Sequence, residues 1–140
     1  MIKLKPYSSS LLTLAGFLLA GIGIYFVFLR PPLLPEDSKY IDLSLSAVQN
    51  NIPGLSDWLQ KVFWVMGGYI FTTGLLTMYV AKTTFRTRTK RVFIIVSIAG
   101  LTSIGSMVIV NFILQSDFRW VLLALTVPWF IGLFLYLLHK

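Results

Sequence analysis

The chain contains no cysteine and a single histidine, His139. Without a thiol it can form no disulfide and no thiolate metal site, and it offers no cysteine for haem or lipid attachment. No HExxH motif, Gly-rich phosphate loop or Ser-His-Asp set occurs either. The sequence therefore predicts no catalytic, cofactor-binding or metal-binding residue, and no cofactor.

Charge is scarce as well. Only 12% of the 140 residues are charged while 56% are hydrophobic, and the mean hydropathy is +0.81. Soluble domains carry about 25% charged residues. The net charge of +7 could indicate nucleic-acid binding, but the basic residues flank long apolar runs. Membrane orientation and anionic lipid headgroups explain that placement, so we expect no nucleic acid as a partner.

Four long apolar runs carry no charged side chain, and they cover residues 11–29, 62–81, 92–114 and 121–138. A helix needs about 20 such residues to cross a hydrocarbon core of about 30 Å. The sequence predicts an all-α fold, an integral membrane four-helix bundle that forms a single domain over residues 1–140. We place its spans at about 11–29, 60–81, 92–114 and 119–138. No small-residue cleavage pattern follows the first run, so we expect that span to be retained rather than removed as a signal peptide.

The short connector at 82–91 carries the strongest orientation signal. It contains five basic residues and no acidic one: Lys82, Arg86, Arg88, Lys90 and Arg91. Basic loops stay in the cytoplasm. This rule predicts that both termini, with Lys3 and Lys140, are cytoplasmic, and that all five acidic residues lie on the opposite face.

The outer loop at 30–59 is the only connector with room for structure. Its first residues are rich in proline, which favours an extended path. Ile41, Leu45, Val48 and Ile52 then recur at helical spacing, so we expect a short amphipathic helix lying on the outer leaflet. Ser56 is the expected cap of the next helix. The loop is either a plain crossover or an interaction surface, lid or docking site, formed by Arg30, Pro31, Pro32, Pro35, Glu36, Asp37 and Trp58.

Small and polar residues inside the spans predict how the helices pack. They are Gly67, Gly68, Thr72, Gly74, Ser103, Ser106, Asn111 and Trp129. Small residues let helix backbones approach closely in lipid, so we expect spans one, two and three to form the tight core, with a polar permeation path as the alternative. No ionisable residue lies at mid-membrane depth, which argues against proton-coupled transport.

In the fourth span, Pro128 removes a backbone N–H and predicts a kink. We expect Thr126 to bond the backbone group that this proline frees. The indole N–H of Trp129 needs a partner at this depth, and a hydroxyl group of span three is the candidate.

Four short stretches resemble segments of uncharacterised small bacterial inner-membrane proteins. They are RPPLLPED at 30–37, PGLSDW at 53–58, WVMGGY at 64–69 and TGLL at 73–76. The resemblance extends through the second span. It implies a multi-pass protein of the bacterial inner (plasma) membrane, and it implies no activity and no site residue.

Three hypotheses of function follow. The first is a non-enzymatic accessory or interaction protein that binds a lipid, another membrane protein or a second copy of itself. The second is a small oligomeric channel or uncoupled carrier, lined by Thr72, Thr73, Thr77, Ser103 and Ser106. The third is an enzyme acting on lipid at the outer leaflet, with chemistry from Glu36, Asp37 and Asp42. The composition favours the first hypothesis, because packing surface is plentiful and reactive groups are few.

Overall fold

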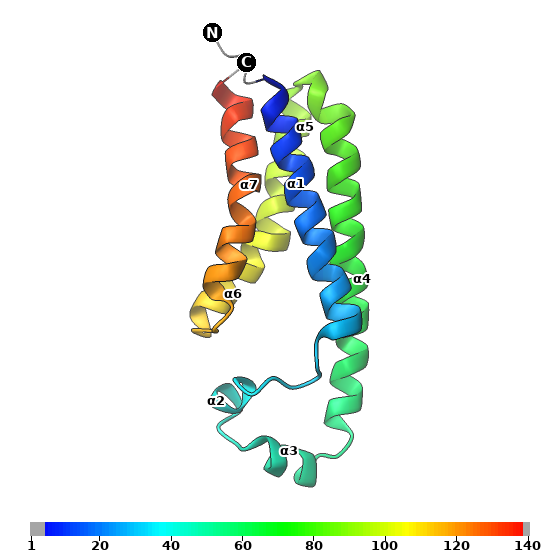
Figure 1. Ribbon diagram of the computed structural model, residues 1–140, viewed down its shortest axis with the longest axis vertical. Coiled ribbons are helices and arrows are strands. Elements are labelled where there is room, and N and C mark those ends of the chain that lie inside the picture. Colours follow the sequence, from blue (N-terminus) through cyan, green and yellow to red (C-terminus); the bar gives the residue numbers. More distant parts are fainter. Residues whose placement is uncertain (1–4, 139–140) are drawn as a thin grey trace.

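The computed structural model describes residues 5–138, which fold into long helices with no β-strand among them (Figure 1). The predicted all-α fold is therefore confirmed. Four helical stretches are long and apolar enough to cross a membrane: Tyr7–Leu29, Leu55–Thr87, Lys90–Ile113 and Arg119–Leu138. The predicted cytoplasmic placement of Lys3 and Lys140 falls outside the described residues, as does His139.

The helices alternate in direction and share two ends. Helix α1 (Lys5–Ile24) continues as the π-helix η1 (Tyr25–Leu29), and α4 (Leu55–Lys82) returns beside it. Helix α5 (Lys90–Gly100) continues through the π-helix η3 (Leu101–Gly105) into α6 (Ser106–Ile113), and α7 (Arg119–Leu138) returns. The start of α1 and the end of α7 lie at the same end of the bundle, called here the terminal end (Figure 1). The opposite end, with residues 30–54 (the loop segment) and the α6–α7 turn, is called the loop end.

Helices α1 and α4 pack through two pairs of glycines. A Cβ atom built on Gly16 would lie 2.8 Å from the carbonyl oxygen of Gly74, and one on Gly23 would lie 2.7 Å from that of Gly67. The two glycines of each helix are seven residues apart, about two turns, so both pairs fall on one face. Gly67 and Gly74 are thus packing residues, as predicted. Gly68 makes no such contact within the chain, because a Cβ built there would meet nothing within 4 Å.

Helix α7 covers another face of α1, and α5–α6 packs mainly on α7, with Val96 and Ile104 in the buried core. A Cβ on Gly132 would lie 3.2 Å from the carbonyl oxygen of Ser8, and one on Gly100 would lie 2.4 Å from Nε1 of Trp129. The prediction that spans one, two and three form the core is therefore wrong, because span four belongs to the core as well, through Trp129 and Tyr136. The small residue that admits close approach in span three is Gly100, whereas Ser106 is exposed and donates to carbonyls of its own helix.

The side-chain partners expected in span four also differ. The indole Nε1 of Trp129 donates to the carbonyl oxygen of Val96 at 3.3 Å, a backbone group and not a hydroxyl. Thr126 donates to the carbonyl of Leu122 at 2.7 Å, one turn back along its own helix, rather than to the group that Pro128 frees. Helix α7 continues through Pro128 without interruption.

The basic connector at the terminal end is folded against the helices. The ring of Phe85 is buried and lies 4.4 Å from the ring of Tyr136, centroid to centroid. The guanidinium of Arg88 donates to the carbonyl oxygen of Tyr136 at 3.3 Å and to the hydroxyl of Ser8 at 3.2 Å. Arg88 therefore places its charge at the last turn of α7, where a cation is favoured by the helix dipole.

The loop segment contains two short helices in place of the single amphipathic helix predicted. Helix α2 (Asp37–Ile41) ends at Asp42, which is left-handed at φ 58°, and α3 (Leu45–Asn51) begins after Ser44. The hydroxyl of Ser44 accepts from the N–H of Ala47 at 3.2 Å, so a local N-cap replaces helix continuation. The predicted cap at Ser56 is also wrong: Gly54 precedes α4 and makes no side-chain cap.

Candidate functional site

A cavity of about 510 Å³ lies at the loop end, between the loop segment, α1–η1, α6 and α7. We call it the loop-end cavity. Its apolar wall comes from the three helical stretches, and its polar groups come mainly from the loop segment and the α6–α7 turn. The lining residues are Leu18, Gly21, Ile22, Tyr25, Phe26, Arg30, Leu34, Glu36, Asp37, Tyr40, Met107, Asn111, Leu114, Ser116, Phe118, Val121, Leu122 and Leu125.

The apolar wall is deep. From Leu18 the lining extends through the end of α1 and the π-helix η1 to Arg30 at the mouth, a length on the order of 15 Å. Half of a hydrocarbon core is about 15 Å. Gly21 adds width, because a Cβ built there would meet nothing within 4 Å. The volume lies within the roughly 300–1,000 Å³ range of ligand pockets.

The π-helix η1 positions Arg30 at the mouth. The backbone N–H of Arg30 donates to the carbonyl oxygen of Tyr25 at 2.8 Å, which closes a five-residue turn. Arg30 itself is extended, at φ −74° and ψ 119°, as expected for a residue before proline. Single π-turns often occur at functional sites. Tyr25 and Phe26 of this turn also line the cavity.

The guanidinium of Arg30 lies against aromatic rings and lacks a close carboxylate. Its carbon atom is 3.5 Å from the centroid of the Phe63 ring and 5.4 Å from that of Phe26, and Nη1 donates to the carbonyl of Pro31 at 3.1 Å. No carboxylate of the described residues lies within 4.0 Å of it. Burial lowers the pKa of Arg30, and the negative charge of Asp37 opposes this shift. The group stays protonated in any case, so the mouth holds a half-buried cation.

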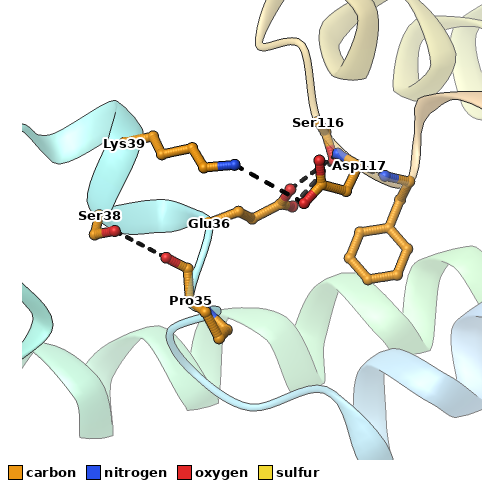
Figure 2. Close-up of polar contacts among 7 residues, drawn as sticks. Pro35, Glu36, Ser38, Lys39, Ser116 and Asp117 are labelled. Atoms are coloured by element: carbon orange, nitrogen blue, oxygen red, sulfur yellow. Dashed lines mark hydrogen bonds and ion pairs between the residues drawn. The ribbon is translucent and has the colours of Figure 1, made fainter.

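The carboxylate of Glu36 joins the loop segment to the α6–α7 turn (Figure 2). Oε1 accepts from the hydroxyl of Ser116 at 3.0 Å, and Oε2 accepts from the backbone N–H of Asp117 at 3.0 Å. We call these three residues the latch. Nζ of Lys39 lies 3.9 Å from Oδ2 of Asp117, but both side chains are largely exposed, so this ion pair adds little. The latch closes one side of the loop-end cavity.

The α6–α7 turn has the backbone geometry of a Schellman motif. The N–H of Ser116 donates to the carbonyl of Asn111 at 2.9 Å, and that of Gln115 donates to the carbonyl of Phe112 at 3.1 Å. Gln115 is left-handed, at φ 53°. The motif turns the chain so that the side chain of Ser116 and the N–H of Asp117 both reach Glu36.

Two further loop residues contribute polar atoms to the mouth. Oδ2 of Asp37 accepts from the backbone N–H of Leu34 at 2.7 Å, which orders the start of α2. Desolvation raises the pKa of the Tyr40 hydroxyl, and the negative charge of Glu36 raises it further. The mouth thus combines one cation, two carboxylates and a neutral phenol.

A second groove of about 480 Å³ lies between α1, α4 and η3–α6 and shares Phe26, Met107 and Asn111 with the loop-end cavity. Thr73, Ser103 and Ser106 line it, but Thr72 and Thr77 do not, so the five hydroxyls of the predicted path do not converge there. The hydroxyls of these three residues donate along their own helices: Thr73 to Tyr69, Ser103 to Ala99, Ser106 to Thr102 and Ser103. Nδ2 of Asn111 donates to Met107 in the same way.

The structure separates the predicted interaction surface into two groups. Arg30, Glu36 and Asp37 meet at the cavity mouth, whereas Pro31, Pro32, Pro35 and Trp58 do not line the cavity. Asp42 does not line it either, so the three carboxylates of the enzyme hypothesis do not share one site. No group of three His, Cys, Asp or Glu side chains between residues 5 and 138 is placed to hold a metal ion.

Sequence reasoning missed the other half of the mouth. Ser116 and Asp117 stand in the short polar connector between two apolar runs, and Gly21 stands within the first run. A polar connector expected at the same end of the bundle as the loop segment was a usable signal for contact. Nothing local distinguishes Gly21, which faces the cavity, from Gly23, which packs against α4.

Comparison with known proteins identifies no relative. A scan of protein families, a search of curated proteins and a search of solved structures each found no match. The function is therefore inferred from the cavity and from the residues that build it.

Proposed function

We propose that this protein is a non-enzymatic accessory protein of the bacterial inner membrane that works by holding an amphipathic molecule in the loop-end cavity. The observation that carries the proposal is the shape and chemistry of that cavity. An apolar wall on the order of 15 Å long extends from a mouth with Arg30, Glu36 and Asp37. A molecule with an apolar tail and a polar head matches both parts.

The membrane placement has separate support. Four helical stretches have the length and hydropathy of spans, and the described ends of the chain lie on one side. The five basic residues of the 82–91 connector lie at that terminal end, which the positive-inside rule assigns to the cytoplasm. The loop-end cavity then opens toward the periplasmic leaflet, where a lipid tail has direct access to its wall.

The contacts of the polar residues favour holding over catalysis. Both carboxylate oxygens of Glu36 accept hydrogen bonds in the latch, and the carboxylate of Asp37 accepts one from the backbone N–H of Leu34. Arg30 is fixed against the ring of Phe63. A general acid or base must exchange a proton with a substrate, whereas these groups already bond the loop segment or its neighbours and keep only their remaining donor and acceptor sites for holding a ligand.

The test fills the cavity without touching helix packing. Gly21→Phe places a ring in open space inside the loop-end cavity, and Gly68→Phe is the matched control, since its Cβ also meets nothing and Gly68 does not line the cavity. Each variant is extracted into native nanodiscs, transferred to mild detergent and analysed by native mass spectrometry. We expect the wild type and the Gly68→Phe variant to retain a bound small molecule or lipid and the Gly21→Phe variant to lose it.

The same spectra report the assembly. A stoichiometric second protein would give the accessory role a partner, and a homo-oligomer would show that the protein associates with itself. Equal retention of the bound molecule by the wild type and the Gly21→Phe variant would refute the cavity as the binding site.

A further inference from the structure

The mouth of the loop-end cavity carries charges of both signs in a small space. Arg30 contributes one positive charge, and Glu36 and Asp37 contribute two negative charges. Burial lowers the pKa of the guanidinium by more than the charge of Asp37 raises it, and no described carboxylate lies within 4.0 Å of the guanidinium. The cation and the carboxylates are therefore neighbours that are not closed into an ion pair.

The guanidinium has donors to spare. Arginine carries five N–H groups, and the hydrogen bond to Pro31 uses one of them. The ring of Phe63 lies against the guanidinium and restricts its orientation. A planar guanidinium with free donors is the side chain best suited to bind a phosphate through two hydrogen bonds.

The carboxylates have acceptor capacity left as well. A carboxylate offers about four lone-pair sites. Glu36 uses two of them on Ser116 and Asp117 and also interacts with the hydroxyl of Tyr40, and Asp37 uses one on Leu34. A primary ammonium group, with three donors, can bind at the remaining sites.

We propose that the loop-end cavity binds a phospholipid whose headgroup carries both a phosphate and a primary ammonium group, the phosphatidylethanolamine class, with one acyl chain against the apolar wall. Phosphate binds at Arg30 and ammonium at Glu36 and Asp37. A headgroup with only negative charge would place that charge beside two carboxylates. This inference depends on the proposed function, because it identifies the molecule that the cavity holds.

Lipid competition tests the headgroup. The purified protein is reconstituted in nanodiscs of equimolar phosphatidylethanolamine and phosphatidylglycerol with identical acyl chains, then re-extracted in mild detergent. Native mass spectrometry measures the ratio of the two lipids bound. We expect an excess of phosphatidylethanolamine of about tenfold, which corresponds to one charge-assisted hydrogen bond.

Two variants separate the two halves of the headgroup. Arg30→Gln should reduce the retention of both lipids, because both carry the phosphate. Asp37→Asn keeps an amide oxygen to accept from Leu34 but removes the charge, so total retention should persist while the preference for phosphatidylethanolamine falls. Lys39→Gln, an exposed residue outside the cavity lining, is the control and should change neither.

The outcomes are distinct. Equal binding of the two lipids by the wild type, or an excess of phosphatidylglycerol, would overturn the headgroup assignment while leaving the Gly21→Phe result to decide the cavity. Lipid that is lost in the Gly21→Phe variant but unaffected by Arg30→Gln would also overturn it. If the Arg30→Gln variant does not fold, the wild-type lipid ratio decides alone.

Discussion

The backbones of Gly23 on α1 and Gly67 on α4 are in direct contact, and a Cβ built on Gly23 would lie only 2.7 Å from the carbonyl oxygen of Gly67. The same Cβ would lie 2.4 Å from the backbone nitrogen of Phe71. Backbone atoms cannot turn aside as a flexible side chain can. This contact fixes the distance between α1 and α4, and α1 in turn carries the wall of the loop-end cavity.

Gly23→Ala should therefore destabilise the bundle. Relief of the contact requires the two helices to separate, at a cost of about 1–3 kcal/mol. The loss of stability is measured as the change in the free energy of unfolding in a detergent micelle. The matched control is Gly68→Ala, which meets open space and should gain up to about 1 kcal/mol from helix propensity. Equal stability of the two variants would show that the α1–α4 contact is looser than described.

The positions of the long helices could be predicted because hydropathy and charge are local properties. Their packing could be predicted only in part. Gly16 and Gly23 are separated by the same number of residues as Gly67 and Gly74, and this equal separation can be seen in the sequence. It is the separation that an antiparallel pair of helices needs to bring the glycines into contact two by two. The hydroxyl residues of span three misled the prediction, because a serine can donate to its own helix and then need no neighbour.

Glu36→Gln should loosen the loop segment. An amide can accept at its oxygen, but its nitrogen cannot accept from Ser116 or Asp117, so one hydrogen bond to a carboxylate is lost. Such bonds contribute about 1.5–3 kcal/mol when buried, and the mouth is partly open, so about 1–2 kcal/mol is expected. Hydrogen exchange at 34–44 and 114–118 should accelerate by roughly tenfold per 1.4 kcal/mol.

The control for the latch is Lys39→Gln. Its ion pair with Asp117 is exposed on both sides and should contribute at most about 1 kcal/mol. Exchange in the same two segments should therefore stay near the wild-type rate. Faster exchange in the Lys39→Gln variant than in the Glu36→Gln variant would contradict the assignment of the latch to Glu36.

Two residues with left-handed backbones should respond in opposite ways to glycine. Gln115 at φ 53° makes the turn of the Schellman motif, and Gln115→Gly should stabilise the protein by about 1 kcal/mol by removing the Cβ strain. Arg88 at φ 55° has the same strain, but its guanidinium bonds Ser8 and Tyr136. Arg88→Gly should therefore destabilise the protein. Thermal unfolding measures the stability of both variants. If both were more stable than the wild type, the structural role given to the Arg88 side chain would be wrong.

The candidate site could be predicted for one side of the mouth only. Arg30, Glu36 and Asp37 are charged residues within eight positions of the loop segment, so their grouping follows from the sequence. The partner of Glu36 lies 80 residues away in another connector, and no local pattern links the two. The two short helices of the loop segment could not be predicted either. The apolar residues recur at helical spacing on both sides of Ser44 and so predict one continuous helix, whereas the N-cap at Ser44 begins a second helix there.

Trp129 and Gly100 form the contact that holds α5 against α7. The indole Nε1 donates to Val96, and its position leaves no room for a Cβ on Gly100. Trp129→Phe removes the donor and part of the ring, so it should cost about 1–3 kcal/mol. Gly100→Ala should cost a similar amount, because the buried indole cannot move aside.

The double variant tests whether the two residues act as one contact. A phenyl ring is smaller than an indole, so it leaves room near Gly100, and Gly100→Ala should cost less in the Trp129→Phe background. The coupling energy should be about 0.5–3 kcal/mol, the range found for residues in contact. Trp64→Phe on the exposed face of α4 is the control and should change stability by less than about 0.5 kcal/mol. Strict additivity of the first two substitutions would show that Gly100 is not confined by the indole.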